Sequence, residues 1–180
     1  MGAMRDVMID LETWGKRPGC ALRSIGAVVF DPRGEELGDE FYVNVTRDSC
    51  EEIGLHVDPD TEAWWARQSS QAQDSLTVDP LPIRDAINKF CSFWRVRALS
   101  RPWSQGANFD QPILEEVMRL LDARVPWKFW DSRCTRTAYG MAGMGKFDMP
   151  KFSGTAHNAL DDALHQARCV QLAHKKLGLR

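Results

Sequence analysis

Two carboxylates near the amino terminus could share a metal ion. Asp10 and Glu12 flank Leu11 at the end of an apolar segment, residues 7–11, whose composition predicts a β-strand. Residues i and i+2 of a strand point to the same side, so the two carboxylates should lie next to each other. Like charges at that separation repel unless a cation lies between them, and Mg²⁺ and Mn²⁺ favour such oxygen ligands. A solvated acidic pair at a strand end explains the spacing equally well.

A third acid, Asp110, follows a predicted short strand over residues 103–107 and precedes a predicted helix over residues 111–121. An acidic residue at this position commonly caps the helix, and Pro112 fits the first helical turn. Capping alone would account for Asp110. Loops at strand ends are also where functional residues collect in α/β proteins, which leaves a role beside the first two acids open.

The segment from His157 to Asp162 opens a predicted helix over residues 158–177. The stripe of this helix that should face the sheet consists of Ala159, Ala163, Gln166, Val170, Ala173 and Leu177. Asp162 lies at the edge of this stripe, whereas Asp161 lies about 200° around the helix from Ala159. We therefore expect Asp162 to point inward and Asp161 outward, although both acids also favour the helix dipole. For His157, a surface or capping role is the alternative to a catalytic one.

Periodicity predicts the elements that would position these residues. Three strands, over residues 7–11, 24–30 and 40–45, are separated by turn signals and predict an antiparallel meander. Helices are predicted over residues 62–68, 83–94, 111–121, about 135–144 and 158–177, and Thr61 is the predicted cap of the first. Short strands are predicted over residues 103–107 and 128–130. This order predicts an α/β fold with one mixed sheet and helices on its faces.

Taken together, the acidic motifs resemble those of the DnaQ-like 3′→5′ exonuclease superfamily, in its DEDDh branch. The motifs are Asp-x-Glu-Thr at 10–13, Asn-Phe-Asp at 108–110 and His-x4-Asp at 157–162. The segments 24–28 and Thr61-x-x-Trp64-Trp65-x-x-Gln68 extend the likeness over about residues 5–175, to phage and prophage exonucleases of the exodeoxyribonuclease VIII-like type. A mycobacterial exoribonuclease branch is similar. The resemblance implies a ribonuclease H-like fold, with a mixed five-stranded sheet that contains the antiparallel meander.

The resemblance also implies the roles of the site residues. Two divalent cations, Mg²⁺ or Mn²⁺, would be held by Asp10, Glu12, Asp110 and Asp162. His157 would be the general base that activates water. The implied substrate-binding residues are Leu11, Thr13, Trp14, Asn108 and Phe109. Trp64 and Trp65 are assigned to the core, and Arg133 and Arg136 either contact phosphate or form a solvated pair.

One position departs from the subgroup. Cys134 in Arg133-Cys134-Thr135-Arg136-Thr137 stands where related sequences usually have an acid, in the pattern Arg-Asp-x-Arg-Thr. The contact made by that acid is in doubt here. The four metal-binding acids and the histidine are retained, so we expect activity to persist.

The function implied is a two-metal 3′→5′ exonuclease that releases nucleoside monophosphates from single strands or 3′ overhangs, with DNA as the expected substrate. An exoribonuclease is the first alternative. A module that binds single-strand ends without cutting is the second, but such a module would normally have lost one of the acids. A hydrolase of nucleotides or other phosphoesters also fits the motifs. Ribonuclease T-like relatives often dimerise, so a homodimer is an expectation by analogy.

Composition is typical of one globular domain. The chain has 180 residues, of which 43% are hydrophobic and 27% charged, and its net charge is −2. This balance argues against tight, sequence-independent binding of long duplexes. We interpret residues 1–4 as an expression scar and residues 5–180 as a single exonuclease domain. Five cysteines without a C-x-x-C pair indicate a reducing compartment, and no apolar run reaches membrane-spanning length. We therefore expect the cytoplasm of a bacterium, or of one infected by phage.

Overall fold

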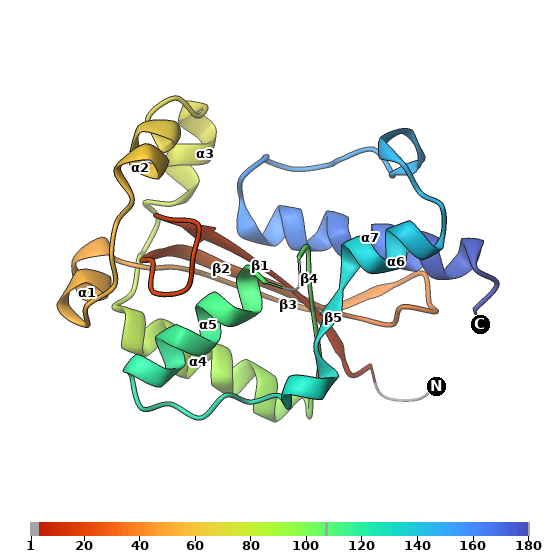
Figure 1. The fold of residues 1–180 in the computed structure, drawn as a ribbon, viewed down its shortest axis with the longest axis horizontal. Helices are drawn as coiled ribbons and strands as arrows, with labels where there is room; N and C mark the ends of the chain where they lie inside the picture. Colours follow the sequence, from red (N-terminus) through yellow and green to blue (C-terminus); the bar gives the residue numbers. More distant parts are fainter. Residues whose placement is uncertain (1–3, 107, 180) are drawn as a thin grey trace.

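The computed structural model describes residues 4–106 and 108–179, so most of the interpreted expression scar and Ala107 of the predicted strand 103–107 lie outside the described residues. A five-stranded sheet with the order β3-β2-β1-β4-β5 forms the centre (Figure 1). The strands are β1 (Asp6–Thr13), β2 (Leu22–Phe30), β3 (Leu37–Asn44), β4 (Arg101–Ser104) and β5 (Arg133–Cys134). The first three form the predicted antiparallel meander, and β4 and β5 run parallel to β1.

Helices cover both faces of the sheet, as predicted (Figure 1). α4 (Ile83–Val96) and α5 (Asp110–Leu120) pack on one face, and α6 (Thr135–Met141) and α7 (Ala159–Lys176) pack on the other. β1 is therefore buried on both sides. Ile9 and Leu11 belong to the core between the sheet and helices α4 and α5. Met8 belongs to the core between the opposite face of the sheet and helices α6 and α7. Because side chains alternate along a strand, Asp10 and Glu12 face α7.

Several short helices complete the fold. They are α1 (Arg47–Glu52), α2 (Pro59–Trp65), α3 (Ser70–Ser75) and the 3₁₀ helices η1 (Phe129–Asp131) and η2 (Lys146–Asp148). None of the described helices combines the length and the apolar character required to cross a membrane.

Two local predictions were wrong. Thr61 does not cap a helix, because α2 begins two residues earlier and Asp58 accepts the capping hydrogen bond from the Asp60 N–H. Residues 128–130 do not form a strand. Phe129 and Trp130 are 81% and 60% exposed, so these two aromatic side chains are not buried against the sheet. The strand that pairs with β4 starts only after this segment.

The amino terminus of α7 lies directly on β2, and Gly26 permits this approach. A Cβ atom at Gly26 would lie 2.2 Å from the backbone carbonyl carbon of Ala159, at the first residue of α7. Gly26 is also the register partner of Asp10 across β1 and β2. The missing side chain therefore places the first turn of α7 over the acidic end of β1.

Candidate active site

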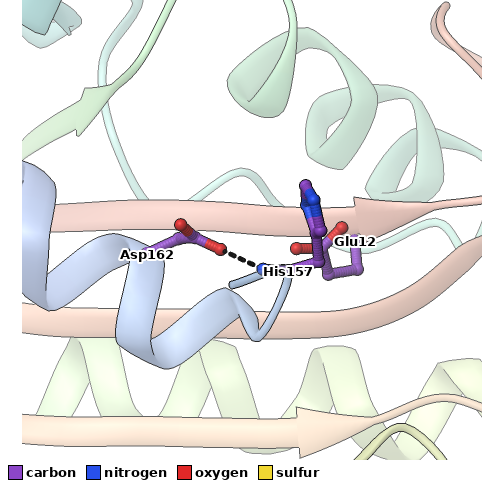
Figure 2. Close-up of side chains that lie close together, drawn as sticks. All are labelled: Glu12, His157 and Asp162. Carbon is purple, nitrogen blue, oxygen red and sulfur yellow. Dashed lines mark hydrogen bonds between the residues drawn. The ribbon is translucent and has the colours of Figure 1, made fainter. Parts of the chain in front are cut away.

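The structure brings together all five residues predicted for catalysis, although they come from three distant segments. Ligand atoms of Glu12, His157 and Asp162 all lie within 4.8 Å of one another (Figure 2). Asp110 approaches from the start of α5, where its Oδ1 accepts a hydrogen bond of 3.2 Å from the Leu11 N–H. The charge of Asp10 interacts with those of the other three acids. Four carboxylates therefore share one end of β1.

Their crowding opposes ionisation. Burial, followed by repulsion from Asp110, Glu12 and Asp162, raises the pKa of Asp10 well above its usual range. Burial, followed by repulsion from Asp162, raises the pKa of Glu12 to about 8. Burial raises the pKa of Asp110 to about 7, and it also raises the pKa of Asp162. These acids cannot all be ionised unless a cation neutralises part of their charge, so the cluster is well suited to bind positive charge.

The donor set fits divalent oxygen-seeking cations. Carboxylates are the side chains that Mg²⁺ and Mn²⁺ favour, and the described residues place no thiolate in the acid cluster. The nearest fixed cations are Arg23, which faces Glu12, and Arg136, which faces Asp110, and each lowers the pKa of its acid. Despite these two arginines, both pKa values stay raised. The cluster therefore has capacity for further positive charge.

His157 is held in an unusual backbone conformation at the entrance to α7. Its φ of 65° lies in the left-handed region, which histidine rarely adopts. Its N–H donates to Asp162 Oδ2 at 3.0 Å, and Asn158 caps the helix by accepting from the Leu160 and Asp161 N–H groups. The ring makes an edge contact with Trp64 at 4.9 Å between centroids. Together these contacts direct the imidazole toward Glu12 and Asp162 (Figure 2).

The predicted difference between the two neighbouring acids of α7 is confirmed. Asp162 belongs to the cluster with Glu12. Asp161 points instead to the preceding loop, where it accepts a hydrogen bond of 2.7 Å from the Thr155 N–H and lies against Gly154. Asp161 is therefore a structural support for the loop that leads to His157.

An aromatic-walled pocket of about 520 Å³ opens beside the acids. Of the predicted substrate-binding residues it is lined by Leu11, Thr13 and Phe109, and Glu12 also contributes. Trp64 is 37% exposed and lines the same pocket, so its assignment to the core was wrong. Its neighbour Trp65 is buried, as predicted. The pocket thus adjoins the metal-binding candidates directly.

Two predicted substrate-binding residues lie elsewhere. Trp14 does not line the pocket, because its ring packs under the guanidinium groups of Arg23 and Arg47. Arg23 lies between Trp14 and Trp65, 4.1 Å and 4.2 Å from the two ring centroids. Asn108 is exposed at the start of α5 and is also absent from the lining.

Cys134 occupies the N-cap position of α6 and makes no side-chain capping hydrogen bond. An acid at an N-cap accepts hydrogen bonds from the first free N–H groups of its helix. The acid that the resemblance led us to expect at position 134 would be placed to cap α6, whose first turn carries Arg136. The departure at Cys134 therefore affects the capping of α6 and leaves the four clustered acids in place.

Sequence reasoning missed Gln166, whose Nε2 donates to Asp10 Oδ1 at 2.7 Å. The signal was visible, since Gln166 is the polar member of the sheet-facing stripe. Arg23 and Arg136 were also not connected with the acids. Their proximity depends on the sheet register and on the packing of α6, for which the sequence carries no local mark.

The raised pKa values predict how the stability of the metal-free protein depends on pH. In the unfolded chain these acids titrate near pH 4, whereas folded Glu12 and Asp110 titrate near 8 and 7. The native state therefore holds protons that the unfolded state has lost. Their contribution to stability is fully present below about pH 4 and is lost as the pH rises toward 8. In EDTA, we expect the melting temperature of wild type to fall relative to that of Glu12→Gln over this range. A difference independent of pH would contradict this expectation.

Comparisons with known proteins agree with this geometry. A family model described as the 3′-5′ exoribonuclease Rv2179c-like domain matches residues 5–174. An exodeoxyribonuclease of Enterobacteria phage T4 is 27% identical over an alignment of 159 residues, and the match covers 74% of this chain and 70% of the phage protein.

Two solved structures share the fold. The nuclease domain of 3′hExo, a DEDDh family member bound to rAMP, matches with a TM-score of 0.65 and 15% identity, over 97% of this chain and 94% of that chain. Pop2p of S. pombe, in a form with bound Mg²⁺ and Mn²⁺, matches with a TM-score of 0.60 and 11% identity, over 98% and 85% of the two chains. The predicted ribonuclease H-like fold is confirmed.

Proposed function

Because the chain belongs to the family of the 3′-5′ exoribonuclease Rv2179c-like domain, and thus to the DEDDh-type 3′→5′ exonucleases, we propose that it hydrolyses the terminal phosphodiester of a single strand with two metal ions. The observation that carries this proposal is the convergence of four acids and His157 beside an aromatic pocket. The products would be nucleoside monophosphates.

The four acids are the proposed cation ligands. Asp10, Glu12, Asp110 and Asp162 would hold two divalent ions, Mg²⁺ or Mn²⁺, and their raised pKa values support a demand for positive charge. When bound, such ions supply charge that stabilises the phosphoryl oxygens and lower the pKa of a coordinated water. Loading the site would release the protons that the acids retain without metal.

His157 would accept the proton of the attacking water. Its ring nitrogens lie near Glu12 and Asp162, within the cluster where the reacting phosphate would be bound. The backbone of His157 is fixed by its own bond to Asp162, and its ring is supported by Trp64. A proton acceptor that is held in place in this way needs little reorganisation during the reaction.

The aromatic pocket would hold the terminal nucleoside. The pocket would offer a base the apolar and aromatic surface of Leu11, Trp64 and Phe109. Stacking on such a surface tolerates any base sequence. Glu12 and the backbone near Thr13 would meet the 3′-hydroxyl. Trp64 would contact the base in place of Trp14, which the resemblance implied as a substrate-binding residue, because Trp64 lines the pocket and Trp14 does not. The pocket lies next to the acids, so a terminal nucleoside bound in it would have its phosphodiester over the cluster.

DNA remains the first proposed substrate, and RNA is the second candidate because the matching family is described as an exoribonuclease. The phage T4 relative, an exodeoxyribonuclease, supports the first choice. The test is digestion of DNA and RNA strands of identical sequence, each labelled at the 5′ end, with Mg²⁺ or Mn²⁺. We expect a higher kcat/KM for DNA. A higher value for RNA would select the second candidate, and binding of both strands without cleavage would contradict the nuclease proposal.

A further inference from the structure

Gln166 makes a buried contact with the acid at the centre of the cluster. It lies on α7, one helical turn after Asp162, and is 5% exposed. Its Nε2 donates to Asp10 Oδ1 at 2.7 Å. In the part of the chain that the structure describes, this is the one hydrogen bond to the Asp10 carboxylate, whose other charged neighbours are the acids Glu12, Asp110 and Asp162.

Packing alone does not explain an amide at this position. The neighbouring buried residues on the inner side of α7 are Ala163, Ala167 and Val170, which are apolar. Gln166 Oε1 is buried and has no hydrogen-bond partner. An unpaired buried acceptor destabilises a fold, so an apolar side chain of similar length would pack here at lower cost. The amide has a local disadvantage for stability, which points to a role in the site.

We propose that Gln166 is a positioning residue for the metal site. Its amide N–H fixes the rotation of the Asp10 carboxylate, so that Asp10 is oriented to bind a divalent cation. Its Oε1 leaves an acceptor available for a water molecule of the same site. Outer hydrogen bonds of this kind orient metal ligands and tune their affinity. This inference rests on the proposed function, since it requires the acids to bind cations.

The test compares Gln166→Met with Gln171→Met. Gln171 is a matched control because it lies on the same helix, is 8% exposed, and its Nε2 donates to the carbonyl oxygens of Asp31 and Glu36, away from the acids. Both substitutions remove a buried amide and keep a flexible side chain. Mn²⁺ binding is measured by calorimetry, and the Mg²⁺ dependence of the rate is measured separately. Gln166→Leu is prepared in parallel in case the methionine variant does not fold.

We expect the Gln166 variants to bind Mn²⁺ about 10–100-fold more weakly than wild type, with most of the rate restored at high Mg²⁺. Gln171→Met should lose thermal stability and keep wild-type affinity for Mn²⁺. Equal Mn²⁺ affinity in wild type and a folded Gln166 variant would overturn the proposal. If wild type itself binds no Mn²⁺, the proposed function fails, and this outcome is distinct from a failure at Gln166 alone.

Discussion

We expect Asp162→Asn to lower kcat by far more than the ~10–100-fold that follows loss of an outer hydrogen-bond partner of a metal ligand. We expect Asp161→Asn to leave kcat within a few-fold of wild type. The two residues are adjacent on α7 and have the same side chain. Asp162 lies with Glu12 and His157, and an amide in its place removes one negative ligand. Asparagine at position 161 still accepts the hydrogen bond from the Thr155 N–H, so the loop before His157 keeps its support.

The measurement is kcat on a labelled single strand at saturating Mg²⁺, with thermal melting as the control for folding. We expect Asp10→Asn and Glu12→Gln to show the same loss as Asp162→Asn. Each of these variants should melt higher than wild type in EDTA near neutral pH, because burial and mutual repulsion raise the pKa values of Asp10 and Glu12 and each substitution removes one acid from the cluster. A larger loss for Asp161→Asn than for Asp162→Asn would show that the orientation of α7 is wrong.

The second large effect is expected at His157. If its imidazole is the general base, His157→Asn removes proton transfer and lowers kcat on the order of 10²–10⁴-fold. Asparagine is chosen because it tolerates the left-handed backbone at φ 65°, whereas alanine would add strain that is unrelated to catalysis. The backbone N–H to Asp162 is retained, so the acids should still bind metal.

Two readouts separate this role from a structural one. The rate of wild type should fall on the acidic side of its pH profile, and the variant should lose this acidic limb. Mn²⁺ affinity should stay near that of wild type. A variant with nearly normal turnover would remove His157 from the reaction, and a variant that no longer binds Mn²⁺ would make His157 a metal ligand.

Local pattern predicted the parts of the fold that depend on one element at a time. The apolar run of β2, the turn signal after it and the alternation in β3 predicted the meander. Spacing predicted the buried faces of α4 and α7, except at Leu177, which lies beyond the end of α7 and is 36% exposed. Helical phase also distinguished Asp162 from Asp161, because α7 is long enough for its buried stripe to be clear. The four acids and His157 were found by their order along the chain, which matches the family motifs.

Features that depend on packing between distant segments could not be predicted. The polar character of Gln166 in the buried stripe was visible in the sequence, but its partner was not, because Gln166 and Asp10 are 156 positions apart and no spacing rule connects them. α2 spans seven residues, too few for helical phase to show that Trp64 is 37% exposed while Trp65, which also lines the pocket, is buried. The aromatic pair Phe129 and Trp130 has the composition of a strand, but these residues form the 3₁₀ helix η1.

The central claim is metal-dependent cleavage from a 3′ end. The most direct measurement uses a 5′-labelled linear single strand and a circular strand of the same sequence, each incubated with Mg²⁺ and with EDTA. We expect the linear strand to shorten by single nucleotides while its label stays on the longer fragments. We also expect the circle to stay intact and EDTA to stop the reaction. Cleavage of the circle, early release of labelled mononucleotide, or full activity in EDTA would contradict a metal-dependent 3′→5′ exonuclease.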